Sequence, residues 1–485
     1  MRITNNIMMR NSLTNINLNK GQYDKLNSQL SSQKKIQRAS EDPIVAIRAL
    51  RLRATYADIN QYLEKNIPDA QHWLEATETA LNTANSLLEE FIYYCNQGVS
   101  DYNTVNEREI LYNQLKQYRD EIYSSANADY AGRTVFTGYK TDRTFAFEKD
   151  DLPRDYKYEI EQQIAFDEID VVKRISGGVD WSDVKEVHES DVQNKEIYRA
   201  QLAYKDIDAG VKLDDVNFPV YVSVNEKSLA ALGDAVYNVN DNEVVIIPET
   251  GEILFGKNAY SAVKTAGGLT ATYRKTGFDE GDIRPEHYFN CTDMSDADQD
   301  RHVKYTISDQ KMDYNINFNQ TITVNTLGKD VYSTGMSRKI DDIMEAVNTA
   351  IEAQKTVENI ERQISETTDE TTLENLNSML KAAQLQLAYA EENMSDVFSG
   401  SITYYQKYQE QINLAIADIG SKDIRLSLNQ TRLEAQELSV SELKSENEEV
   451  NITEVAVQLQ ASSDVYDASL AAAAKVIQKS LLDFL

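Results

Sequence analysis

Apolar residues repeat at helical spacing over a long stretch near the start of the chain. Between Leu52 and Cys95, apolar or small side chains follow one another every three or four residues with few mismatches. Asp42 can cap the first turn, and Gly98 marks the end. This spacing predicts one long helix with a near-heptad stripe, disturbed at Pro68, that needs a helical partner of similar length.

Both ends of the chain also carry a single apolar stripe at helical spacing. The stripes consist of Met9, Leu13, Ile16, Tyr23, Leu26 and Leu30 at the N-terminus, and of Ile452, Val455, Leu459, Tyr466, Leu470, Ala473, Ile477, Leu481 and Phe484 at the C-terminus. One such stripe stabilises a helix by less than the loss of backbone freedom costs. We therefore expect both end helices to be mobile in a free subunit and to become ordered when neighbouring subunits bury them. A closed bundle within one chain is the alternative.

The spacing changes from helical to alternating between about residue 156 and residue 332. Alternation of apolar and polar residues predicts at least six strands, including a pair at 244–247 and 253–255 joined by a turn. Helical spacing returns at Ile340, with a break at the acidic stretch 365–372. The expected fold is mainly α, a long antiparallel coiled-coil rod formed by N- and C-terminal helices with a β-rich domain inserted between them.

This pattern divides the chain into five expected segments. They are an N-terminal assembly helix and linker at 1–39, N-terminal rod helices and a β-hairpin at 40–150, a β-rich outer domain at 151–335, C-terminal rod helices at 336–449, and a C-terminal assembly helix at 450–485. Because helical segments enclose the β-rich one, the chain is expected to leave along a rod and return beside it.

Composition excludes several classes of function. The 485 residues contain only six prolines, which favours long helices, and their formal net charge of -30 argues against nucleic acid as a partner. Residues 1–40 differ, with seven Lys or Arg and one acid. Two cysteines are too few for a disulfide framework. No apolar run is long enough for membrane insertion, and the N-terminus lacks the apolar block of a secretory signal, so export would need another route.

Three short motifs resemble catalytic or metal sites, but each lacks a residue that its chemistry requires. They are Gly251, Gly256 and Lys257 for a P-loop, His188 and Glu189 for a zinc peptidase, and Asp296, Asp298 and Asp300 for a calcium loop. Asn258 stands where the P-loop needs Ser or Thr, Val192 where zinc needs a second histidine, and Arg301 where the calcium loop needs glycine. We therefore expect no catalytic residue, no cofactor and no metal.

The segment from Leu30 to Leu50, LSSQKKIQRASEDPIVAIRAL, resembles the junction between terminal and rod domains in the flagellin superfamily. That junction usually reads SSG, then a basic run, then SDDP. Here Gln33 replaces the glycine and Glu41 replaces an aspartate, while the expected helix start is kept.

Two further segments are more similar to the hook-filament junction proteins of that superfamily, the hook-associated protein 3 family, than to filament flagellin. They are Glu107-Arg108-Glu109 through ANADYAGRTVFTGYKTDRTFAF, and the ending SLLDFL at Ser480 to Leu485. The resemblance covers about residues 1–150 and 405–485.

The resemblance implies a secreted structural subunit of the bacterial flagellum that serves motility. It implies export in the unfolded state through the flagellar channel, with a chaperone on the C-terminal helix. The implied partners are hook-associated protein 1, flagellin, and further copies of the chain in a ring. Filament flagellin is the alternative, because the β-rich insertion exceeds the usual short junction protein. A hypothesis of another class is a secreted coiled-coil effector or adhesin whose β domain binds a host protein or glycan.

Overall fold

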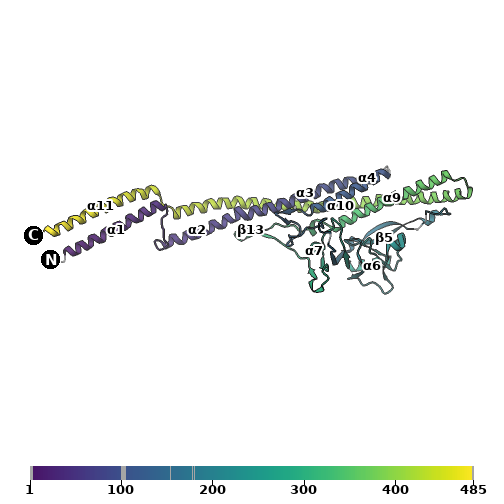
Figure 1. Ribbon diagram of the computed structural model, residues 1–485, viewed down its shortest axis with the longest axis horizontal. Coiled ribbons are helices and arrows are strands. Elements are labelled where there is room, and N and C mark those ends of the chain that lie inside the picture. Colours follow the sequence, from purple (N-terminus) through teal and green to yellow (C-terminus); the bar gives the residue numbers. More distant parts are fainter. Residues whose placement is uncertain (1–3, 100–104, 153, 177–178, 180, 483–485) are drawn as a thin grey trace. The chain divides into compact units, whose positions relative to one another are not determined.

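The computed structural model describes residues 4–99, 105–152, 154–176, 179 and 181–482. The chain divides into two compact units, and each is considered by itself (Figure 1). The terminal unit comprises Met1–Asp69, Tyr314–Ile322 and Ile424–Leu485, and the central unit comprises Ala70–Asp313 and Thr323–Asp423.

Long helices lie at both ends of the chain, with a β-rich region between them. The helices are α1 (Thr4–Ser32), α2 (Pro43–Gln61), α3 (Ile67–Gly98), α4 (Val105–Ser125), α5 (Leu229–Leu232), α6 (Lys257–Ala266), α7 (Pro285–Tyr288), α8 (Gly328–Val331), α9 (Thr334–Glu366), α10 (Glu370–Glu448) and α11 (Ile452–Leu482). The predicted fold class, mainly α with a β-rich insertion between N- and C-terminal helices, is confirmed. The predicted break in the stretch 365–372 is also confirmed, because α9 ends at Glu366 and α10 begins at Glu370.

The predicted long helix consists of α2 and α3. Asp42 caps it, since its carboxylate accepts hydrogen bonds from the backbone N–H groups of Ile44 and Val45. From Ile67 onwards the predicted stripe is fully buried, at Ile67, Ala70, Leu74, Thr77, Leu81, Ala84, Leu88, Phe91 and Cys95. The heptad pattern therefore identified the buried side of this helix correctly.

The disturbance expected at Pro68 takes the form of a π-helical turn, Tyr62–Asn66, between the two helices. Proline has no N–H, and its ring would clash with the carbonyl of Glu64 in a regular α-helix. The wider turn moves the hydrogen-bonding pattern by one residue, so that the N–H of Ile67 donates to the carbonyl of Tyr62.

In the central unit, α3 packs closely against α10. The rings of Phe91 and Tyr405 lie 4.4 Å apart between centroids. A Cβ atom on Gly98 would lie 2.5 Å from the ring of Phe398, so only glycine permits this approach. Along α10, apolar residues that recur every seven positions are buried at Ile412 and Ile419 in the central unit and at Leu426 and Leu433 in the terminal unit.

In the described residues of the β-rich region there are two five-stranded sheets and two short hairpins. The strands are β1 (Asp129–Tyr130), β2 (Arg133–Thr134), β3 (Lys157–Ala165), β4 (Asp170–Ser176), β5 (Gln193–Gln201), β6 (Asp208–Asp214), β7 (Ser223–Glu226), β8 (Glu243–Ile247), β9 (Glu252–Phe255), β10 (Gly268–Thr276), β11 (Asn290–Asp293), β12 (Val303–Tyr305), β13 (Asp313–Asn317) and β14 (Gln320–Thr323). One sheet has the order β12-β11-β3-β10-β6, and the other has the order β4-β5-β9-β8-β7. The predicted turn between β8 and β9 is present, with Gly251 at a φ of 64°.

The two five-stranded sheets share one hydrophobic core. Ile160 on β3 and Ala271 on β10 come from one sheet, and Ile246 on β8 and Ile253 on β9 come from the other. All four side chains are fully buried. The sheets thus bury their apolar faces against each other, as layered β domains do.

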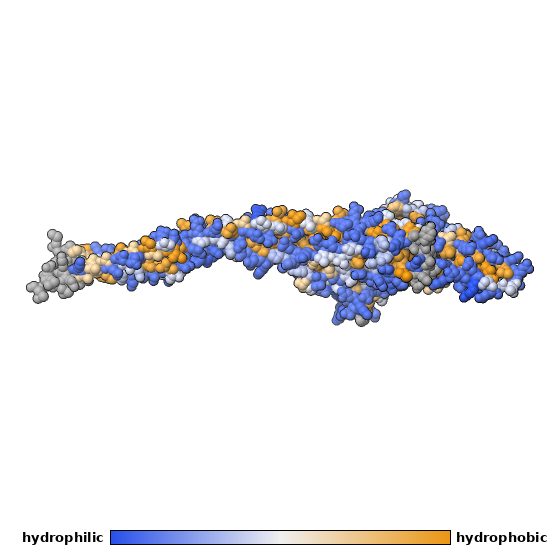
Figure 2. Space-filling view, turned by 90° about the horizontal axis from the view of Figure 1, so that it is seen from above, coloured by the Kyte–Doolittle hydropathy of each residue, from blue (hydrophilic) through white to orange (hydrophobic). Residues whose placement is uncertain are grey.

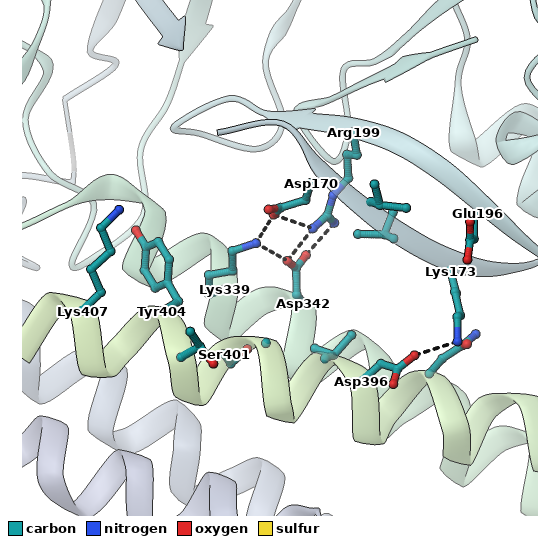
Figure 3. A pocket seen from close by; sticks show the side chains of 16 residues that line it. Asp170, Lys173, Glu196, Arg199, Lys339, Asp342, Asp396, Ser401, Tyr404 and Lys407 are labelled. Carbon is teal, nitrogen blue, oxygen red and sulfur yellow. Dashed lines mark hydrogen bonds and ion pairs between the residues drawn. The ribbon is translucent and has the colours of Figure 1, made fainter. Parts of the chain in front are cut away.

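A buried arginine joins the second sheet to α9 (Figure 3). The side chain of Arg199 on β5 is 2% exposed, and its Nη1 donates to Glu252 Oε1 on β9 at 2.8 Å. The same guanidinium group donates to both carboxylate oxygens of Asp342 on α9, at 2.7 and 2.6 Å. Burial by itself raises the pKa of Asp342, but attraction to Arg199 and its hydrogen bonds outweigh burial and lower the pKa to about 2. Asp342 is therefore ionised at neutral pH.

Further charges extend this cluster. Arg174 on β4 contacts Glu252 at 3.2 Å and Glu345 at 2.8 Å. Lys339 on α9 pairs with Asp170 on β4. Figure 3 shows Asp170, Arg199, Lys339 and Asp342 converging from strands and helix. They line a pocket with a volume of 440 Å³. The cluster fixes the sheet on α9 by charged hydrogen bonds, which demand one geometry, in addition to apolar packing, which tolerates several.

The buried cluster can be tested with Arg199→Met. This change leaves the carboxylates of Glu252 and Asp342 buried without their main cation, so we expect a loss of about 3–5 kcal/mol in the free energy of unfolding. Lys173→Met is the matched control, because its partners Glu392 and Asp396 are 53% and 56% exposed. The control should lose less than about 1 kcal/mol. Urea unfolding followed by circular dichroism measures both, and equal losses would contradict a special role for Arg199.

Candidate assembly interface

The two terminal helices pair with each other in the terminal unit. Helices α1 and α11 lie side by side in Figure 1, and contacts between residues 19 and 469 and between residues 23 and 466 make the pair antiparallel. The rings of Tyr23 and Tyr466 stack with centroids 6.4 Å apart, and Asn19 Nδ2 donates to Ser469 Oγ at 2.6 Å. The structure thus brings the two predicted stripes together along part of their length.

Few of the predicted stripe residues are fully covered by this pairing. Leu26 and Val455 are buried, whereas Ile16, Tyr23, Leu30, Leu459, Tyr466 and Ala473 are half-buried. Four others are exposed, Met9 by 36%, Leu13 by 53%, Ile452 by 49% and Leu470 by 42%. Ile477 and Leu481 belong to α11, but their side chains lie outside the described part, and Phe484 lies outside the described residues altogether.

Among the described side chains of these two helices, five further large apolar ones are exposed beside the predicted stripes. They are Ile7, Met8, Leu18, Val457 and Val465. The prediction of one apolar stripe for each end helix did not include these residues, although the spacing of eight residues between Val457 and Val465 is a helical signal. Figure 2 shows such apolar side chains interspersed among hydrophilic ones on the surface. Because exposed apolar patches of this kind typically mark interaction sites, the α1/α11 pair is a candidate interface for protein partners.

The linkers next to these helices pair as well. Lys34 and Glu449 form an antiparallel β-bridge. The N–H of Lys35 donates to the carbonyl of Glu448 at 2.7 Å, and the N–H of Val450 donates to the carbonyl of Gln33 at 3.1 Å. The link between α1 and α2 is therefore tied to the link between α10 and α11.

Glu448 is the charged centre of this junction. Its side chain is 5% exposed and lies 2.8 Å from Lys34 Nζ and 2.5 Å from Arg53 Nη2. Hydrogen bonds from Arg53 lower the pKa of Glu448, burial opposes them, and Lys34 adds to the lowering, which brings the pKa to about 2. Sequence reasoning missed this residue. The available signal was an acidic run beside the end of α10 opposite the basic run in the first linker.

Gln33 adopts a left-handed backbone conformation, with a φ of 57°. Glycine reaches this region without steric cost, whereas a residue with a Cβ atom pays for close contact with the following carbonyl. The position is the one where the resembling segment usually has glycine. The linker thus keeps a glycine-like geometry with a different residue.

The three motifs that resembled catalytic or metal sites do not form such sites in the described structure. Residues 252–255 of the P-loop-like stretch form β9, and they are buried. His188 is exposed beside Glu186, and Asp296 pairs with Arg301 on an exposed loop. Among the described residues, no group of three or more His, Cys, Asp or Glu could hold a metal ion. Within the same residues, none of the helices has the length and apolar character needed to cross a membrane.

Comparison with known proteins identifies the class of the N-terminal part. Residues 3–141 match the family model of the bacterial flagellin N-terminal helical region. This match confirms the resemblance to the flagellin superfamily that the linker sequence indicated. The matched residues include α1, α2 and α3, and therefore one partner of the α1/α11 pair.

The curated relatives include both branches considered from the sequence. The chain is 30% identical over 149 residues to flagellar hook-associated protein 3 of Salmonella typhimurium, which covers 29% of this chain and 45% of that protein. It is 31% identical over 127 residues to a flagellin of Clostridium tyrobutyricum, which covers 26% of this chain and 33% of that protein. The predicted likeness to hook-associated protein 3 is thus confirmed, although the chain spans less than half the length of either relative.

Solved structures of similar proteins share little sequence with this chain. A flagellar hook-associated protein from Vibrio parahaemolyticus matches with 14% identity and a TM-score of 0.35, over 84% of this chain and all of that one. FlgL from Xanthomonas campestris matches with 12% identity and a TM-score of 0.25, over 79% of this chain and 98% of that one. These TM-scores are too low to compare the arrangement of the elements.

The left-handed conformation of Gln33 predicts that two substitutions at this position affect stability differently. Gln33→Gly removes a steric cost of about 1–2 kcal/mol and increases unfolded-state freedom by a similar or smaller amount, so stability should be unchanged or slightly higher. Gln33→Val should lower the free energy of unfolding by at least about 1 kcal/mol, because a β-branched side chain strongly disfavours positive φ. Urea unfolding of both variants tests the geometry. A valine variant as stable as the glycine variant would be inconsistent with it.

The ion pairs of Glu448 predict that the stability of the fold decreases over a defined range of acidic pH. The folded pKa is about 2 and lies below the ordinary value of 4.5, so ionised Glu448 stabilises the fold at neutral pH. That contribution should be lost as the pH falls from about 4.5 towards 2. Glu448→Gln should therefore flatten the dependence of the unfolding temperature on pH in this range, measured by circular dichroism. Glu446→Gln, which removes an exposed carboxylate from the same helix, is the charge-matched control, and an equal flattening in both variants would contradict the role of Glu448.

Proposed function

We propose that this chain is a structural subunit of the bacterial flagellum that joins hook-associated protein 1 to the flagellin filament. Two findings support the proposal, the flagellin N-terminal helical region at residues 3–141 and the similarity to flagellar hook-associated protein 3. A structural role needs no catalytic centre, and the proposed subunit is not an enzyme. Its location would be the hook-filament junction, outside the cell.

The observation that carries the proposal is the incomplete burial of the α1/α11 pair. Leu13 is 53% exposed and Leu470 is 42% exposed, although both lie on apolar stripes. Copies of the chain packed side by side would cover these residues with the same helices of their neighbours. Coiled-coil packing of the terminal helices in a ring would then supply the contacts that one chain lacks.

The same helices determine the other proposed partners. Hook-associated protein 1 would pack on one side of the ring and flagellin on the other. During export an unfolded chain would expose the stripe of α11, and a chaperone bound to this segment would keep it from aggregating. In this proposal residues 1–39 and 450–485 are assembly segments, and residues 151–335 form an outer domain.

Filament flagellin is the second candidate, because the chain is also 31% identical over 127 residues to a flagellin. Immunogold labelling of intact flagella separates the two functions. A single band of label at the filament base supports the junction role, continuous labelling supports flagellin, and absence of label from flagella would refute both.

The assembly role of α11 predicts a strong effect of Leu470→Asp. Leu470 is 42% exposed in a single chain, so the charge can reach solvent there and should leave the fold intact, but it should prevent neighbours from covering the stripe. We expect filament formation to be abolished, as counted by electron microscopy, with an unchanged circular dichroism spectrum. Ala471→Asp is the matched control, since it puts the same charge on an exposed position one turn from Asp467, about 100° around α11 from Leu470. Normal filament numbers with Leu470→Asp would refute the proposed interface.

A further inference from the structure

The two long segments of the terminal unit, residues 1–69 and 424–485, carry opposite net charge. Residues 1–69 contain eleven Lys or Arg and six Asp or Glu, which gives a net charge of +5. Residues 424–485 contain five Lys or Arg and ten Asp or Glu, which gives a net charge of -5. Opposite charge on antiparallel helices suggests ion pairs between them. Yet in the described part of this unit, every ion pair between the two segments involves Glu448.

Helix α2 presents an apolar and basic face to solvent. Ile44 is 71% exposed and Ile47 is 55% exposed. Arg48 and Arg51 are also exposed, and neither makes an ion pair within the described structure. At about 100° per residue, these four side chains fall within about 100° around the helix axis. They are called the α2 face below.

Helix α10 presents an apolar and acidic face at the same level of the unit. This α10 face consists of Leu438, which is 63% exposed, with Glu442 and Glu446, which are exposed and make no ion pair with described residues. Ile424 and Leu428, exposed by 63% and 68%, extend it along the same side of the helix. The buried residues Leu426 and Leu433 lie on the opposite side, about 180° away.

The two faces cannot meet within one chain, because α10 directs its buried side and not its acidic side towards the interior of the unit. They do lie at one level. Asn447 Nδ2 on α10 donates to the carbonyl of Val45 on α2 at 3.1 Å, and Arg53 reaches Glu448. A neighbouring copy placed side by side, without a shift along the helices, would therefore bring its α10 face opposite the α2 face.

We propose that the α2 face of one copy of this chain binds the α10 face of the next copy. In this register Arg48 would pair with Glu446 and Arg51 with Glu442, since Val45 is level with Asn447 and the two helices are antiparallel. Such a contact joins two different surfaces, so repetition closes a ring or continues as a helix, and the contact does not stop at a dimer. The inference rests on the proposed function only in assuming that copies of the chain assemble.

Charge reversal tests this pairing with the full-length chain. Arg48→Glu/Arg51→Glu makes both faces acidic, and Glu442→Lys/Glu446→Lys makes both faces basic, so neither variant should assemble with itself. In a mixture of the two variants, copies that alternate have opposite charge at their contacts, so the mixture should assemble. A chain that carries all four substitutions should also assemble, because its two faces have simply exchanged charge.

The contact is detected by cross-linking in a chain that also carries Ile47→Cys and Leu443→Cys. Leu443 is 49% exposed, and the antiparallel pairing of Val45 with Asn447 puts it at nearly the same level as Ile47. The native thiols of Cys95 and Cys291 are both buried, so they should not react with a thiol cross-linker added to intact cells of the source bacterium. We expect a ladder of cross-linked oligomers with the native faces, at least a tenfold loss in each double-reversal variant, and recovery to at least half when both variants are produced together. Lys212→Glu/Lys304→Glu, which changes the charge equally on the exposed surface of the central unit, should leave the ladder unchanged.

The outcomes separate this inference from the proposed function. Absence of the ladder, an undiminished ladder in a double-reversal variant, or loss without recovery in the mixture would each overturn the contact between the α2 and α10 faces. A gold band at the filament base in that case would still support the junction role. Recovery in the mixture together with label elsewhere on the cell would support the contact and refute the junction role.

Discussion

A helix with one apolar stripe is stable only when another helix or sheet covers that stripe, and this requirement governs the whole chain. Helix α3 meets it in the central unit, where its stripe is buried and Gly98 allows the ring of Phe398 to come close. Helices α1 and α11 meet it only in part, because their pairing buries Leu26 and Val455 and leaves Leu13 and Leu470 exposed. The same requirement is thus met by a buried core in the central unit and leaves exposed apolar side chains in the terminal unit.

The central unit adds a second constraint, which is the position of a sheet on α9. Apolar side chains alone would tolerate several positions, since hydrophobic contact is not directional. The buried guanidinium of Arg199 selects one, because it must reach Glu252 on the sheet and Asp342 on the helix at the same time. Buried charges of this kind contribute little net stability, but leaving one unpaired is costly. The cluster therefore serves to specify the arrangement.

Periodicity predicted the elements but could not predict contacts that depend on three-dimensional proximity. The heptad stripe identified the buried side of α3, and Asp42 and the 365–372 break marked helix ends, because these signals are local in sequence. The π-helical turn before Pro68 was foreseen only as a disturbance. The links of Arg199 to Asp342 and of Glu448 to Arg53 join residues far apart in the sequence, and no spacing rule connects them. The left-handed φ of Gln33 was hidden because glutamine rarely adopts it.

The distribution of charge between the units accords with the proposed assembly. The terminal unit carries sixteen basic and sixteen acidic residues, so the whole formal net charge of -30 belongs to the central unit. Because the terminal unit is neutral as a whole, many copies of it can pack at short distances. Its positive segment and its negative segment then favour one orientation of the neighbouring copy. Strongly acidic units repel one another at the same distances unless they point apart into solvent. In the proposed assembly, the charge balance therefore favours contacts between terminal units over contacts between central units.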